Sequence, residues 1–135
     1  MEKLQCEQMN LSGLAEAETV LSGIGCTAAG VRIMREKALF YVLKIPQVES
    51  KAANLLKQTF LAKGADAAVS KNAADLSEKY TDILIFATLR QYRQAIPELY
   101  QQPWGLKKIA AALELFFAEK QSKEEGFSFI RSECK

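Results

Sequence analysis

Apolar residues recur at helical spacing in four segments of the chain, and three of these segments carry their own start or stop signals. The first helix is expected at residues 11–22, with Ser12 as its N-cap. A second helix is expected to begin with Ser50 as N-cap and to end at Gly64. The apolar stripe of this second helix consists of Ala52, Leu55, Leu56 and Phe60.

The two C-terminal helices follow one another closely. Thr88 and Gln91 have the spacing of a capping box, so a third helix is expected to begin at Thr88 and to reach about Gln101. Pro97 lies inside that helix and is expected to kink it. The fourth helix begins at Leu106, and its apolar face is formed by Leu106, Ile109, Ala110, Leu113, Phe116 and Phe117.

Short apolar runs between these helices predict strands. Val31–Met34 and Ala67–Ser70 predict short strands, and Leu39–Ile45 predicts a longer one that Pro46 ends. Leu39–Ile45 has apolar residues on both faces, which is typical of an internal strand. Ile83–Ala87 is continuously apolar, so it predicts a central strand that is covered on both faces.

The order of elements predicts an α/β fold, with α+β as an alternative. We expect a mixed, four-stranded sheet packed with about four helices, in which residues 39–70 form a right-handed strand–helix–strand crossover. Residues 1–120 are expected to form a single domain, and residues 121–135 a polar tail or linker. Within that tail, Phe127–Ile130 predicts either a small edge strand or the start of a further element.

The amino-acid composition limits the catalytic and binding functions that the chain can have. The 135 residues include no histidine, so the commonest general base and metal ligand is missing from the chain. Cys6, Cys26 and Cys134 are far apart and odd in number, which favours free thiols. The net charge is +2, and acidic and basic residues alternate along the chain, so the sequence shows no clustered basic surface of the kind that binds nucleic acid. No apolar run is long enough to span a membrane and no secretion signal is visible, so a cytoplasmic location is expected.

Two sets of residues are candidates for binding. Lys57, Asp66, Ser70 and Arg90 could form an anion or small-ligand site, although solvated helix faces are the favoured interpretation of Lys57 and Arg90. Trp104 and Tyr92 are candidates for an interface, since large aromatic residues are enriched at interaction hot spots. For Trp104, a packing role between the last two helices is the favoured interpretation. The carboxylates show no metal-binding spacing, and no metal site is predicted.

From about Gly23 to Leu113 the amino-acid sequence resembles the N-terminal region of the long bacterial dihydropteroate synthases. In the first part of this region, short matches occur in Gly30–Met34, at Lys37-Ala38 and at Tyr41-Val42. The later matches, in order, are Asn54–Gln58, Leu61, Lys63–Ser70, Thr81–Leu84, Thr88–Tyr92 and Gln102–Leu106.

The resemblance implies a role in folate biosynthesis alongside a catalytic TIM barrel. In that family the barrel binds a pterin diphosphate, magnesium and p-aminobenzoate, and it needs about 250 residues that this chain does not supply. No catalytic residue and no cofactor can therefore be assigned here, although a longer parent protein would be a pterin-diphosphate transferase.

Three functions are consistent with these observations. The first is a non-catalytic accessory domain whose partner is the barrel, in the same or another chain, or a second copy of itself. The second is a free-standing sensor of a pterin, nucleotide or amino acid. The third is a lone enzyme that uses lysine or carboxylate chemistry.

Overall fold

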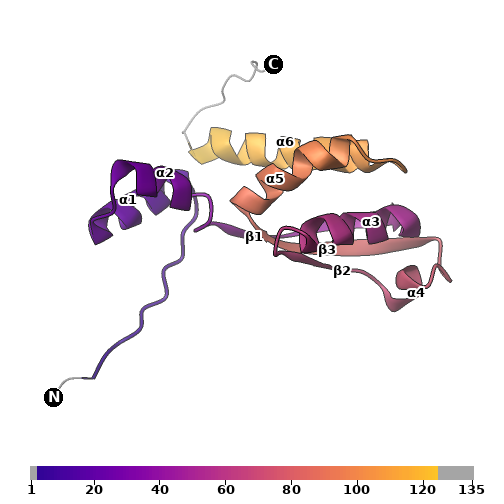
Figure 1. Ribbon diagram of the computed structural model, residues 1–135, viewed down its shortest axis with the longest axis horizontal. Helices are drawn as coiled ribbons and strands as arrows, with labels where there is room; N and C mark the ends of the chain where they lie inside the picture. The colour runs from indigo at the N-terminus through magenta and orange to yellow at the C-terminus, as the bar shows by residue number, and fades with distance from the viewer. Residues whose placement is uncertain (1–2, 125–135) are drawn as a thin grey trace.

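The computed structural model describes residues 3–124. Six helices and three strands follow in mixed order along this part of the chain (Figure 1). Their bounds are α1 (Leu14–Ile24), α2 (Ala28–Met34), β1 (Phe40–Glu49), α3 (Ser50–Leu61), β2 (Asp66–Ala68), α4 (Lys71–Ala74), β3 (Tyr80–Thr88), α5 (Leu89–Tyr100) and α6 (Leu106–Glu124). The mixed α/β class predicted from the sequence is confirmed.

The strands form one sheet in the order β1-β3-β2, and both neighbours of β3 run antiparallel to it. β1 and β2 are consequently parallel to each other, and α3 connects them. This is a split strand–helix–strand unit, in which β3 lies between the two parallel strands. A strand–helix–strand connection between parallel strands is therefore present as predicted, but its strands are not neighbours, and the sheet of the described residues has three strands rather than four.

Helices α3, α5 and α6 lie along one face of the sheet (Figure 1). The alternate residues of β3 that point to this side are all buried, as the two-residue period of a strand requires. They contact the stripe predicted for α3, where Ala52, Leu56 and Phe60 are fully or almost fully buried. Four apolar residues of α6 complete this core, namely Leu106, Ile109, Ala110 and Leu113.

The capping box at the start of α5 is confirmed. The Thr88 hydroxyl accepts a hydrogen bond from the Gln91 amide at 3.2 Å, and the Gln91 side chain accepts one from the Thr88 amide at 2.9 Å. The Gln91 amide group also donates to the carbonyl of Lys63 at 2.9 Å, which ties the start of α5 to the end of α3. The helix continues past Pro97 to Tyr100.

Two expectations for the helix starts are corrected. Gly13, not Ser12, is the N-cap of α1, because the Ser12 hydroxyl and amide both donate to the Glu16 carboxylate. Ser50 is the first residue of α3 instead of its cap, and its hydroxyl donates to the carbonyl of Glu78 at 2.6 Å.

Two predicted strand features are wrong. Val31–Met34 belongs to helix α2, because the Thr27 side chain caps that helix by accepting from the Gly30 amide at 3.0 Å. Pro46 does not end β1, since the strand passes it through an irregularity in the pairing. At that irregularity Gln47 has a φ of 56°, and its amide donates to the Asp82 carboxylate.

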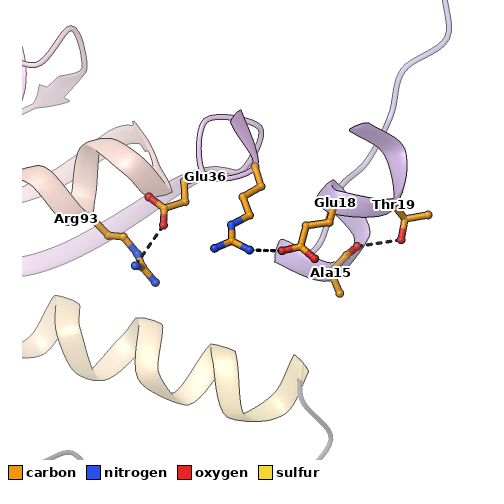
Figure 2. A network of polar contacts seen from close by, with 6 residues as sticks. Ala15, Glu18, Thr19, Glu36 and Arg93 are labelled. Carbon is orange, nitrogen blue, oxygen red and sulfur yellow. Dashed lines mark hydrogen bonds and ion pairs between the residues drawn. The ribbon is translucent and has the colours of Figure 1, made fainter. Parts of the chain in front are cut away.

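Helices α1 and α2 form a small lobe at one end of the sheet. The Arg35 side chain pairs with Glu18 of α1, and Arg93 of α5 pairs with Glu36 at 3.2 Å (Figure 2). The buried residues Ala17, Leu39 and Leu89 form a second, smaller apolar cluster there. The Arg93–Glu36 ion pair and the apolar cluster thus hold the lobe against the start of α5, while the Arg35–Glu18 pair lies within the lobe.

Helix α6 extends into the residues that the sequence predicts as a polar tail. Helix α6 continues to Glu124, so residues 121–124 are helical although they were assigned to a polar tail. The strand expected at Phe127–Ile130 and the thiol of Cys134 lie outside the described residues.

Candidate functional site

The main candidate site is the sheet face opposite the helices. In the central strand β3, Leu84 and Phe86 point to this face, because their neighbours Ile83 and Ile85 point into the core. In β1, Phe40 and Val42 lie on the same face, paired with Thr88 and Phe86 in register. Phe40 is 60% exposed and Val42 51% exposed, so these side chains have no covering layer among the described residues.

This face contradicts the two predictions of an internal β1 and a doubly covered β3. Among residues 3–124, β1 is an edge strand, and β3 is central but covered by helices on one side (Figure 1). The apolar pattern on which these predictions were based is present in the structure, since both strands carry apolar residues on both faces. In a sheet with one solvent face, polar residues are expected on the open side. An apolar open face therefore indicates a surface that another molecule or domain covers.

Charged side chains stand around the apolar residues of this face. Lys44 of β1 and Asp82 of β3 approach each other at 3.7 Å, and both are at least half exposed. Asp66 lies on the other edge, where it pairs in register with Phe86. The open face, defined by Phe40, Val42, Lys44, Asp66, Ala68, Asp82, Leu84 and Phe86, thus has an apolar centre and a charged margin.

The structure brings together some of the predicted ligand-binding residues. Lys57 donates to the Asp66 carboxylate at 2.8 Å and to the carbonyl of Ala67 at 2.6 Å. The hydrogen bond from Lys57, with that from the Ala67 amide, holds the pKa of Asp66 below its ordinary value. Ser70 caps the short helix α4, accepting from the Asn72 amide at 3.1 Å. Lys57 and Asp66 thus satisfy each other at the β2 edge, whereas Ser70 bonds to Asn72 and Thr81 instead.

Arg90 lies elsewhere. It stands in a basic hollow at the start of α5, which is lined by Lys37, Lys63, Thr88, Arg90, Gln91 and Gln94. Lys63 is already paired with Glu98 at 2.6 Å. The first amides of α5 are engaged as well, since those of Leu89 and Arg90 donate to the carbonyls of Leu39 and Glu36, and that of Gln91 donates to Thr88 in the capping box. Arg90 therefore does not share a site with the Lys57–Asp66 pair.

The two aromatic interface candidates have different environments. Tyr92 as an interface residue is a wrong prediction, because its side chain is fully buried. Its hydroxyl donates to the carbonyls of Tyr41 and Ile85 at 2.9 and 3.3 Å. Trp104 is 52% exposed, with a φ of 62° and the Lys51 ammonium 6.0 Å from its ring centroid. It therefore does not fill a gap in the core.

Across residues 3–124, no three histidine, cysteine or carboxylate side chains gather where they could hold a metal ion. In the same part of the chain no helix has the length and apolarity needed to cross a membrane.

Two curated proteins are similar to this chain. A probable bifunctional folylpolyglutamate synthase/dihydropteroate synthase of Halobacterium salinarum is 30% identical over 106 residues, which are 78% of this chain and 13% of that protein. A bifunctional dihydropteroate synthase/dihydropteroate reductase of Helicobacter pylori is 28% identical over 81 residues, 60% of this chain and 21% of that protein. No family model matches, and no solved structure matches.

The matched region spans about an eighth to a fifth of the length of these relatives. The comparisons therefore link this chain to bifunctional proteins of folate biosynthesis, at the level of one part of such a protein.

Proposed function

We propose that this chain is a non-catalytic accessory domain of a dihydropteroate synthase-like protein of folate biosynthesis, and that it supports the assembly of the synthase barrel or access to it. The barrel lies in the same or another chain. The observation that carries the proposal is the open face, where Leu84 and Phe86 of the central strand and Val42 of its neighbour form an apolar surface that no described element covers.

The fold supports a position outside the barrel. A TIM barrel contains only parallel neighbouring strands, each followed by a helix. Both strand pairs in this chain are antiparallel. The chain therefore cannot supply a section of such a barrel, although both relatives carry dihydropteroate synthase in their names.

The barrel also offers the kind of surface that the open face requires. An apolar sheet face is commonly covered by a layer of helices, and the outside of a TIM barrel is a ring of helices. Docking one or two of these helices on the open face would complete a helix–sheet–helix arrangement. Lys44 and Asp82 at the margin would then meet the charged sides of amphipathic helices.

The test uses this chain and the dihydropteroate synthase barrel of the same organism, produced as separate polypeptides. The wild-type chain is expected to bind the barrel, and Leu84→Lys to weaken binding by about 30-fold or more, because a charge would be buried at the centre of the interface. Leu115→Lys is the matched control, since Leu115 is exposed on α6, away from the open face. Titration calorimetry and thermal unfolding of each variant separate lost binding from lost folding.

Two results would contradict this proposal. One is a Leu84→Lys chain that binds the barrel as tightly as the wild type. The other is a chain that sediments alone as a dimer which Leu84→Lys dissociates, because the open face would then be covered by a second copy.

A second candidate function has support from the Helicobacter pylori relative. Its 81 matched residues are 21% of its length, so it contains about 390 residues. A synthase barrel of about 250 residues leaves a part of about 140 residues, which is close to the 135 residues of this chain. The second activity in that protein's name, dihydropteroate reductase, would then fall in the part that resembles this chain.

A direct assay separates the two functions. Under the accessory-domain proposal, the purified chain should not consume dihydropteroate in the presence of a reduced nicotinamide or flavin donor, the cofactor classes that deliver hydride. Reduction that scales with the concentration of the chain, and that Leu115→Lys leaves intact, would establish the reductase function in place of the accessory one.

A further inference from the structure

A groove lies on the helix side of the sheet, at the junction of α1, β1, α5 and α6. It encloses about 340 Å³. Its walls are apolar and partly aromatic, formed by Leu14, Leu39, Tyr41, Leu89, Ile96, Pro97 and Phe117. Ligand sites in proteins are typically concave and apolar with a few placed polar groups, and this groove is within the usual range of volume.

The polar groups of the groove are unevenly distributed. Among the described residues that line it, three are charged, namely Arg93, Glu114 and Lys120. Tyr100 on α5 donates to Glu114 on α6 at 2.6 Å. These two residues therefore lie side by side along the axes of the two helices. Lys120 follows Glu114 by six residues, or about 9 Å along the helix. Helices α5 and α6 run in opposite directions (Figure 1). Arg93, seven positions before Tyr100 on α5, therefore lies about 10 Å from Tyr100 in the same direction as Lys120 lies from Glu114.

The two cations therefore stand at one end of the groove and the carboxylate at the other. Arg93 pairs with Glu36 at 3.2 Å, and Figure 2 shows its guanidinium group on the side of α5 that faces α6. An arginine has five N–H donors, so one carboxylate contact leaves others for a ligand. The Lys120 ammonium lies 5.5 Å from the centroid of the Tyr41 ring, above an aromatic wall of the groove.

We propose that this groove binds a small organic anion, with an apolar body of about two fused rings between the aromatic walls and its carboxylate between Arg93 and Lys120. The inference goes beyond the accessory role, because the groove lies on the helix side and the open face on the other. It also places small-molecule binding away from Lys57, Asp66, Ser70 and Arg90, where the sequence suggested it.

The size of the ligand follows from the volume of the groove. An apolar cavity of about 150 Å³ holds one benzene molecule. A groove of about 340 Å³ has room for a second ring and a carboxylate. A phosphate-rich nucleotide fits the wall chemistry poorly, because eight of the described lining side chains are apolar or aromatic and two are cationic.

The experiment titrates the 135-residue chain with 2-naphthoate and follows binding by backbone amide chemical shifts. Binding is expected below about 1 mM, with shifts concentrated in β1, α5 and the second half of α6. The cation 2-naphthylmethylammonium has the same rings and the opposite charge, and it should bind at least about 10-fold more weakly.

Two pairs of variants locate the site. Ala118→Phe fills the groove and should weaken 2-naphthoate binding at least about 10-fold, whereas Ala111→Phe places the same ring on an exposed part of α6 outside the groove and should leave it unchanged. Lys120→Gln should weaken binding about 3- to 10-fold, whereas Lys108→Gln at the other end of α6 should not.

Absence of binding at millimolar 2-naphthoate would overturn the proposal. So would binding that Ala118→Phe leaves intact, because the probe would then occupy another surface such as the open face. Equal affinity for the anion and the cation would also contradict it, because Arg93 and Lys120 would then not recognise the carboxylate. None of these results depends on whether the chain binds a synthase barrel.

Discussion

Phe60→Ala is expected to lower the free energy of unfolding by about 3–5 kcal/mol, which is the usual cost of emptying a buried phenylalanine site. Phe60 is fully buried on the stripe of α3 that packs against the sheet. Its ring also contacts the ring of Tyr92 of α5 edge-on, with centroids 5.4 Å apart. The substitution therefore removes contacts to the helix layer and the sheet at once. Since small domains are stable by about 5–15 kcal/mol, much of the stability should be lost.

Urea unfolding at neutral pH measures this loss, and the next residue provides the control. Leu61 is 40% exposed on the same helix, so Leu61→Ala should change the free energy of unfolding by less than about 0.5 kcal/mol. Phe60→Leu keeps most of the apolar volume and should lie between the two, which preserves a measurable transition if the alanine variant is mostly unfolded. Equal losses for Phe60→Ala and Leu61→Ala would mean that α3 does not pack as described.

The sequence predicted those elements whose signals are local. The capping box at Thr88 and Gln91 and the α3 stripe depend on spacings of three or four residues, and both are present. The same kind of signal was available for α2, where Thr27 could have been recognised as an N-cap. The β-branched residues Val31 and Ile33 favoured a strand instead. They are nevertheless compatible with helix α2, because β-branching lowers helix propensity only slightly and tertiary contacts override it.

The architecture of the sheet could not be deduced in the same way. A strand reveals through its alternation which residues share a face, but not whether that face is covered within its own chain. Apolar residues on both faces of 39–45 and 83–87 correctly identified an apolar surface, and only the assumption that this chain covers it was wrong. Pro46 stopped the predicted strand because a proline lacks an amide donor, yet the irregular pairing beside it accommodates that loss.

The candidate sites depended on long-range placement. The ion pair between Lys57 and Asp66 joins residues nine positions apart, and their neighbourhood was predicted. Arg90 was predicted to share their site, whereas α5 carries it to a separate hollow. The groove combines side chains from residue 14 to residue 121, and no spacing along the chain could have predicted it.

The stability of the fold is expected to fall steeply in alkali because of Tyr92. Its hydroxyl is buried and donates to two carbonyl groups, and this burial raises the pKa of Tyr92 well above its ordinary value. In the unfolded chain the tyrosine ionises near pH 10. Below about pH 10 both states keep the proton, so the contribution of Tyr92 is fully present. Above about pH 10 only the unfolded state loses it, and the free energy of unfolding should fall by about 1.4 kcal/mol per pH unit until the folded pKa is reached.

Tyr92→Phe separates this effect from the titration of the other groups in the protein. At neutral pH the variant should be less stable by about 0.5–1.5 kcal/mol, since the hydrogen bonds to Tyr41 and Ile85 are lost. Between about pH 9 and pH 11, however, its stability should decline less steeply than that of the wild type, because phenylalanine has no proton to release. Tyr80→Phe is the matched control, as Tyr80 is half exposed at the start of β3, and it should retain the wild-type steepness. A Tyr92→Phe variant as sensitive to alkali as the wild type would show that the hydroxyl of Tyr92 reaches solvent and that α5 is not seated on the sheet in the way described.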